Sequence, residues 1–196
     1  DNIVSSVGKV KPFGLEDIGL NPTKIETAQY PKFLQQYVKM NRRKKMTDTA
    51  PIFGSFDKKI RTFLKITKSL RRWYGLHRTE QLRQCFIERP FINVEVAIFL
   101  NLLKMGDFYE CDNTFLHAFD EGISSKGILN FIKNAKHNFI GTIFPFQPFT
   151  FWCLKNLGLK QVLKNLDTLT LMNLGGGFAI AVDLYLKLRQ FFSKKH

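Results

Sequence analysis

The chain has few of the residues from which catalytic, disulfide and metal sites are built. It contains three cysteines and four histidines in 196 residues, and no Cys-x-x-Cys pair. The odd number and wide spacing of Cys85, Cys111 and Cys153 favour buried, reduced thiols over a disulfide framework or a zinc ribbon. The scattered histidines do not combine with a nucleophile and an orienting group. The sequence therefore predicts no enzyme, no cofactor, no metal and no small-molecule substrate.

Acidic residues are also scarce. Sixteen Asp and Glu stand against thirty Lys and Arg, so the formal net charge is +14 at pH 7. The imbalance is concentrated, because residues 39–89 hold fifteen basic and only four acidic side chains. A soluble monomer does not need a charge of this size. The composition predicts a polyanionic neighbour, which is RNA, DNA or an anionic membrane surface.

Long uninterrupted apolar segments are missing as well. Residues 138–154 carry no charge, but two prolines and a glycine disfavour a continuous helix there. The glycine triplet 175–177 predicts a hinge, and the apolar segment 178–186 after it is too short to span a bilayer. The C-terminal third is therefore predicted to be a buried or partner-facing region. Membrane contact through this third is the alternative, with basic residues at the lipid headgroups.

What is present from residue 58 onward is a helical pattern. Apolar residues recur with a period near 3.6, and glycine-marked turns separate the segments. Helices are predicted over 58–74, from 79 to before 90, over 93–105, from 112 or 113 to 122, from 124 or 125 to 135, from about 150, and over 157–166, 168–174 and 178–192. Asn93 is the predicted N-cap of the third. No alternating run is long enough to predict a sheet.

The first 57 residues differ from the rest. Glycines and prolines are spread through them, apart from a short helical pattern over 31–40. Such a segment cannot bury enough apolar surface by itself, so an arm ordered by partners is predicted. The predicted fold is mainly α, with helical hairpins packed as a bundle or short solenoid. The predicted domains are an extended irregular N-terminal arm with a basic cluster over 1–57 and a helical domain over 58–196.

The strongest candidate site is a basic stripe on the predicted helix 58–74. Cations recur there at helical spacing, opposite the apolar side, along about 16 Å of helix. A stripe of this kind can follow several phosphates, and a neighbouring Trp can stack on an unpaired base. The predicted nucleic-acid-binding residues are Lys39, Arg42, Arg43, Lys44, Lys45, Lys58, Arg61, Lys65, Lys68, Arg71, Arg72, Trp73 and Arg78. The alternative is a merely solvated helix face.

Two segments read alike: SLRRWYGLHRTEQLRQCFIE (69–88) and NLLKMGDFYECDNTFLHAFDE (101–121), with an echo in CLKNLGLKQVLKNL (153–166). Each has a helix that ends in Gly, a short polar link and a second helix. With its LLKMGDF turn, the chain weakly resembles the heptatricopeptide-type helical-hairpin proteins and related organellar families, over roughly half its length. The resemblance implies RNA contact in a mitochondrion or plastid. Ordinary αα-hairpins are the alternative.

Together these features predict a non-catalytic structural subunit of a large organellar ribonucleoprotein, the mitochondrial ribosome. Its predicted partners are rRNA, bound through the basic residues, and neighbouring proteins of the assembly. The alternative is an accessory subunit of a mitochondrial inner-membrane respiratory or ATP synthase complex, with the apolar C-terminal third at the bilayer.

Overall fold

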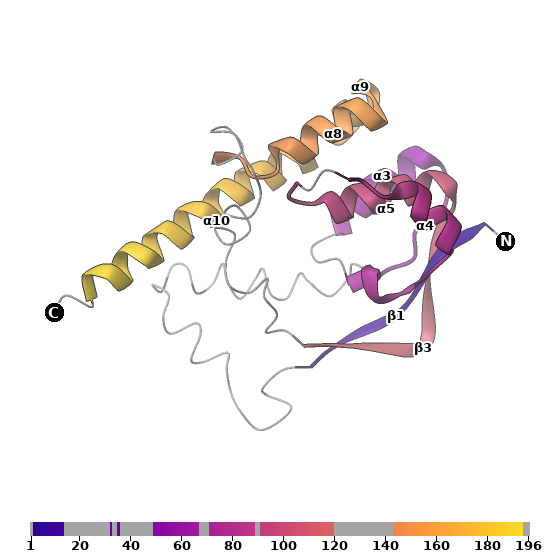
Figure 1. The fold of residues 1–196 in the computed structure, drawn as a ribbon, viewed down its shortest axis with the longest axis horizontal. Coiled ribbons are helices and arrows are strands. Elements are labelled where there is room, and N and C mark those ends of the chain that lie inside the picture. The colour runs from indigo at the N-terminus through magenta and orange to yellow at the C-terminus, as the bar shows by residue number, and fades with distance from the viewer. Residues whose placement is uncertain are drawn as a thin grey trace. The chain divides into compact units, whose positions relative to one another are not determined.

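The computed structural model describes residues 2–13, 32, 35, 49–66, 71–88, 91–119 and 143–193. Over these residues the chain is mainly helical with a small three-stranded sheet (Figure 1). The mainly α prediction is thus confirmed in its coarse form, whereas the bundle or short solenoid of hairpins stays a prediction. The predicted helix from 124 or 125 to 135 and most of the predicted helix 31–40 lie outside the described residues.

The chain divides into two compact units. The first contains residues 1–84 and 100–122, and the second contains residues 85–99 and 123–196. The helix α5 (Val94–Met105) contributes to both. This division differs from the predicted arm over 1–57 and helical domain over 58–196, which stays a prediction.

The sheet lies in the first unit and was not predicted. Strand β1 (Ile3–Phe13) occupies the centre, with β2 (Leu76–His77) antiparallel on one side and β3 (Asp107–Phe119) parallel on the other. The N-terminal residues therefore form a strand, and the irregular arm is not confirmed. The predicted helix from 112 or 113 to 122 is also wrong, because β3 continues to residue 119.

The pairing itself explains why the strands escaped prediction. The register of β1 and β3 shifts between Gly8, which faces Cys111, and Lys9, which faces Phe115. Three residues of β3 are left unpaired at this irregularity, so the alternation of side chains along the strand is interrupted. Each strand also depends on a partner about a hundred residues away, which overrides the local capping signals of 112–113.

Helix α3 (Phe56–Ile66) supplies much of the apolar core of the first unit. Its Ile60, Phe63 and Leu64 side chains are buried. The Phe63 ring meets Phe108 of β3 edge to face, with centroids 5.9 Å apart. Ile52 exchanges two backbone hydrogen bonds with Phe108, at 2.8 and 3.0 Å. The core thus joins α3, the segment before it and the sheet.

Three shorter elements follow the predictions in part. Of the predicted helix 58–74, residues up to 66 are α-helical and residues 71–74 form the 3-10 turn η3 (Arg71–Tyr74), while residues 67–70 lie outside the described part of the chain. Helix α4 (Thr79–Cys85) begins at the predicted residue. Helix α5 has the predicted bounds, and the carbonyl of Asn93 accepts a hydrogen bond from the Ala97 amide at 3.1 Å. Asn93 has φ 71°, a left-handed conformation that asparagine tolerates better than most residues.

The described part of the second unit contains α8 (Gln147–Leu157), α9 (Leu159–Lys164) and α10 (Leu166–Ser193). Helix α10 runs without interruption for 28 residues to the end of the yellow ribbon in Figure 1. The predicted hinge at 175–177 is therefore wrong. A Cβ on Gly176 would lie 2.7 Å from the Phe146 ring and from Pro145, so this glycine permits a close approach inside a helix.

Helix α10 packs along one side against the elements before it. Leu169 and Ile180 are buried, and the Asn173 amide donates a 3.0 Å hydrogen bond to Oγ1 of Thr150 on α8. At the start of α10, the buried Asn165 side chain donates to the Gln161 carbonyl at 2.8 Å. These contacts lie one or two helical turns apart, so they define a single packed side.

Candidate nucleic-acid interface

Part of the predicted basic stripe lies on α3. Lys58 and Lys65 are exposed and Arg61 is half-buried, while the apolar residues of the same helix face the core. Ser55 starts the helix, since its carbonyl accepts from the Lys59 amide at 2.9 Å. We call Lys58, Arg61 and Lys65 the α3 stripe. Its positions three and four residues apart place the three cations on one side of the helix.

Lys59, next to the stripe, is buried and has a structural role. Its Nζ is buried, donates to the Gly106 carbonyl at 2.8 Å and lies 3.1 Å from Oδ1 of Asp107. This ion pair connects α3 to the first residue of β3. Sequence reasoning missed it, although one signal was available: Lys59 stands at helical spacing with Phe63 on the apolar side of α3.

Arg71 and Arg72 are interior residues of the first unit. Arg72 is 1% exposed and Arg71 is 8% exposed. Nη2 of Arg72 donates to the carbonyls of Thr49 and Ala50 at 2.7 and 2.8 Å, and the guanidinium carbon lies 4.7 Å from the centre of the Phe108 ring. Arg72 belongs to the 3-10 turn η3 and not to an α-helix, so the α-helical period that predicted an outward side chain does not apply to it. We therefore leave both arginines out of the proposed contact surface.

The last two residues of η3 and the segment after it are more exposed than Arg71 and Arg72. Trp73 is half-buried, and the neighbouring Tyr74 is 73% exposed. Nε of the exposed Arg78 donates to the Ile3 carbonyl at 2.8 Å, which anchors this arginine to β1. Burial is the main cause that lowers the pKa of His77 on β2. Tyr74 is thus better placed than Trp73 to stack on a base.

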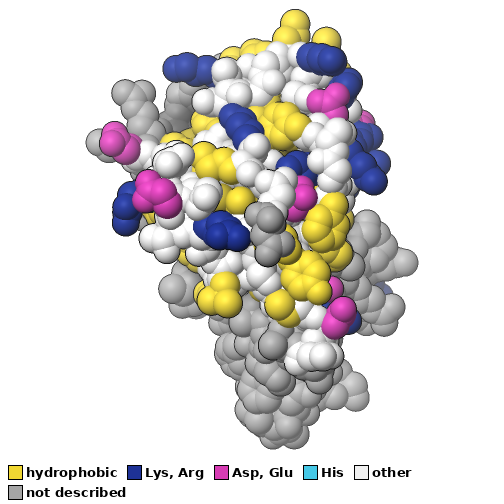
Figure 2. Space-filling view, turned by 90° about the vertical axis from the view of Figure 1, so that its right-hand side faces the viewer, with side chains coloured by type: hydrophobic (Ala, Val, Ile, Leu, Met, Phe, Trp, Pro, Cys, Tyr) yellow, Lys and Arg dark blue, Asp and Glu magenta, His cyan; other side chains and the backbone are white. Residues whose placement is uncertain are grey.

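The predicted basic cluster cannot be placed. Lys68 and the five cations of the cluster, Lys39, Arg42, Arg43, Lys44 and Lys45, lie outside the described residues. Figure 2 shows one face of the molecule, where the described Lys and Arg side chains alternate with acidic and hydrophobic ones. On that face the described residues supply separate cations, of the kind that contacts individual phosphates.

The thiols and the acidic side chains give this region no metal site. Among the residues that the structure describes, no three His, Cys, Asp or Glu are grouped so that they could hold a metal ion. Cys85 and Cys153 are buried and unbridged, as predicted, whereas Cys111 is half-buried with its Sγ 3.1 Å from Oγ of Ser6. Burial raises the pKa of Cys153 to about 12, so its thiol is protonated at neutral pH.

Comparison with known proteins adds no relative. The chain matches no known protein family, no curated protein and no solved structure. The resemblance to heptatricopeptide-type proteins stays a prediction.

Proposed function

We propose that this protein is a non-catalytic structural subunit of a large organellar ribonucleoprotein, the mitochondrial ribosome. Its partners are rRNA and neighbouring proteins of the particle. The observation that carries the proposal is the α3 stripe, three cations on the solvent side of a helix whose other side is core. Together with a net charge of +14, this arrangement fits a polyanion better than a protein or small-molecule ligand.

The proposed contact surface combines the α3 stripe with residues around it in sequence. Exposed Arg78 and Tyr74 follow the helix, and the cluster 39–45 precedes it. Lysine and arginine bind phosphate without reading bases, and an exposed aromatic ring stacks on any unpaired base. Binding would come from counterion release and burial, which suits a subunit that is held in place by a folded RNA.

The test is the triple charge reversal Lys58→Glu, Arg61→Glu and Lys65→Glu. We expect the variant to leave the particle, and native extract treated with RNase to release the wild-type chain in the same way. With purified rRNA, the slope of log K against log salt should fall by about 2, because three phosphate contacts are lost. The readouts are sedimentation of the extract and a salt titration of binding.

The matched control reverses three exposed lysines of the second unit, Lys155→Glu, Lys160→Glu and Lys164→Glu. Both triple variants change the net charge by the same amount. Loss of particle association only in the α3 variant supports a local contact. Equal retention of the α3 variant and the wild type would count against the proposal.

A second function is favoured by one observation. Within the described residues, one helix segment, Leu166–Arg189 of α10, is apolar and long enough to cross a membrane, and only 17% of its most apolar stretch is buried. The apolar segment 178–186, too short by itself to span a bilayer, is thus part of a longer continuous helix. An accessory subunit of an inner-membrane respiratory or ATP synthase complex would stay in the membrane pellet after alkaline carbonate, and RNase would not change its sedimentation.

A further inference from the structure

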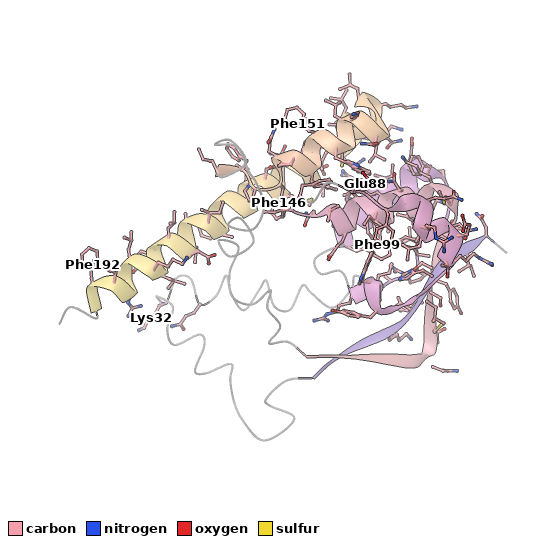
Figure 3. The ribbon with its side chains drawn as sticks, viewed as in Figure 1. Lys32, Glu88, Phe99, Phe146, Phe151 and Phe192 are labelled. Atoms are coloured by element: carbon pink, nitrogen blue, oxygen red, sulfur yellow. The ribbon has the colours of Figure 1, made fainter. Side chains whose placement is uncertain are left out.

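The outer side of α10 carries an apolar seam with a regular repeat. Its residues are separated alternately by three and four positions, which is the spacing of a coiled-coil interface. The seam consists of Leu171, Leu174, Phe178, Ala181, Tyr185, Leu188 and Phe192. All seven are exposed, and none of the six large side chains is less than 45% exposed. Figure 3 shows Phe192 at the far end of this helix.

This seam is distinct from the side of α10 that packs within the second unit. The buried residues Leu169, Gly176 and Ile180 and the hydrogen-bonded Asn173 lie on the other side. A seam spanning residues 171–192 is about 32 Å long at 1.5 Å per residue. It is therefore a second apolar surface, largely exposed, on a helix that already has one packed side.

The repeat favours a helix over a bilayer as the occupant. A bilayer needs apolar side chains around the whole helix, whereas Asp183 and Lys187 lie outside the seam and within the apolar segment of α10. Charged groups inside hydrocarbon are costly. A partner helix needs only one apolar strip and leaves Asp183 and Lys187 outside the interface, together with the exposed Leu184 and Phe191.

The order of large and small residues along the seam fits a second copy of the same helix in the antiparallel direction. When residues 166 and 193 of the two copies overlie each other, the helices overlap over their full length. Phe178 then faces Ala181 of the second copy, Leu174 faces Tyr185, and Leu171 faces Leu188. Each pair occurs twice, as a two-fold axis requires. Phe178 therefore meets Ala181, the smallest side chain of the seam, and Phe192 lies opposite Asp167 beyond the leucine pair.

The charges at the two ends of α10 agree with this direction. Asp167 lies in the first turn, whereas Lys187 and Arg189 lie near the end and Lys194 and Lys195 follow it in the sequence. An antiparallel pair brings Asp167 of each helix beside the basic end of the other. A parallel pair would instead place the two basic ends together and set Phe178 against Phe178.

From the repeat, the size pairing and the end charges, we infer that the seam of α10 is a homodimer interface in which two copies of this chain pair their α10 helices antiparallel. The interface lies in the second unit, so it is independent of the proposed rRNA contact on α3. Failure of either proposal leaves the other standing.

The test measures the mass of the full-length chain by light scattering over a range of concentrations. The wild type should approach twice 22.8 kDa as the concentration rises. The single variants Leu171→Lys and Leu188→Glu should each weaken the dimer by about 10- to 100-fold, since each buries a charge where a leucine was buried. The double variant should recover part of this loss, because Lys at 171 faces Glu at 188 of the second copy.

The control makes the same two changes on α9, Leu159→Lys and Leu163→Glu, where both leucines are exposed outside the seam. These variants should keep the wild-type mass, and circular dichroism should show unchanged helix content in all variants. A wild type that is monomeric throughout, or single variants that dimerise like the wild type, would overturn the inference. A chain that stays monomeric and binds anionic phospholipid vesicles through the seam would also overturn the inference. A double variant weaker than both singles would overturn the antiparallel direction.

Discussion

The first unit buries basic side chains, whereas the second unit exposes apolar ones. Lys59 and Arg72 lie inside the first unit, each with carbonyl oxygens as hydrogen-bond acceptors. In the second unit, Leu171, Leu174 and Leu188 of α10 are more than half exposed. Residue type alone thus does not decide between interior and surface. A cation enters a core where acceptors are already in place, and a leucine stays outside where a partner supplies the contact.

The largest expected effect is the loss of stability on removing the buried cation Arg72 from the first unit. Arg72→Met keeps the long side chain but leaves the Thr49 and Ala50 carbonyls without their donor, so we expect the free energy of unfolding to fall by about 3 kcal/mol. Chemical denaturation followed by circular dichroism measures this change. Arg83→Met is the control, because Arg83 forms an exposed ion pair with Glu80 at 3.0 Å and its loss should cost less than about 0.5 kcal/mol. A variant at position 72 as stable as the control would show that the buried guanidinium is dispensable.

A smaller change in the free energy of unfolding should distinguish the packed side of α10 from its open side. Gly176→Ala places a methyl group against Phe146 and Pro145, and we expect a loss of about 1 kcal/mol after the gain in helix propensity is subtracted. Gly175→Ala meets nothing within 4 Å and should stabilise the protein by about 0.8 kcal/mol. Paired denaturation curves measure both changes. Stabilisation by both alanines would mean that the Gly176 side of the helix is not packed.

The smallest effect is the pH dependence from His77. Because burial lowers its pKa in the folded state, the unfolded chain binds more protons below about pH 6.5. The stability contributed by neutral His77 is therefore fully present above the unfolded pKa and is lost as the pH falls through the folded pKa. His77→Gln should flatten the slope of stability against pH in this window. An unchanged slope in the variant would assign the acid sensitivity to other groups.

The sequence predicted those elements whose signal is local. The bounds of α5 and the start of α4 follow from turn residues and an unbroken 3.6-residue period, and both were correct. The pairing of β1 with β3 was missed because each strand is irregular by itself and is stabilised by a distant partner. The continuity of α10 was missed because a glycine triplet breaks isolated helices but permits close packing here.

In the candidate site, too, the sequence predicted the position of a side chain only where the signal was local. Periodicity alone identified the α3 stripe, since Lys58, Arg61 and Lys65 share one side of a regular helix. The same periodicity extended to Arg72 was wrong about its direction, because Arg72 lies in the 3-10 turn η3 and its guanidinium is buried. The spacing of residues predicts the direction of their side chains only within the helix to which that spacing belongs.

By itself, the sequence determined the large positive charge, the mainly helical character and the cationic side of α3, because composition and short-range periodicity need no knowledge of distant residues. Only the tertiary structure decided which cations are buried, which strand the N-terminal residues pair with, and which side of α10 remains exposed. Those outcomes depend on acceptors, rings and strands that come together from far apart in the chain, and their positions are set by the packing of the whole unit.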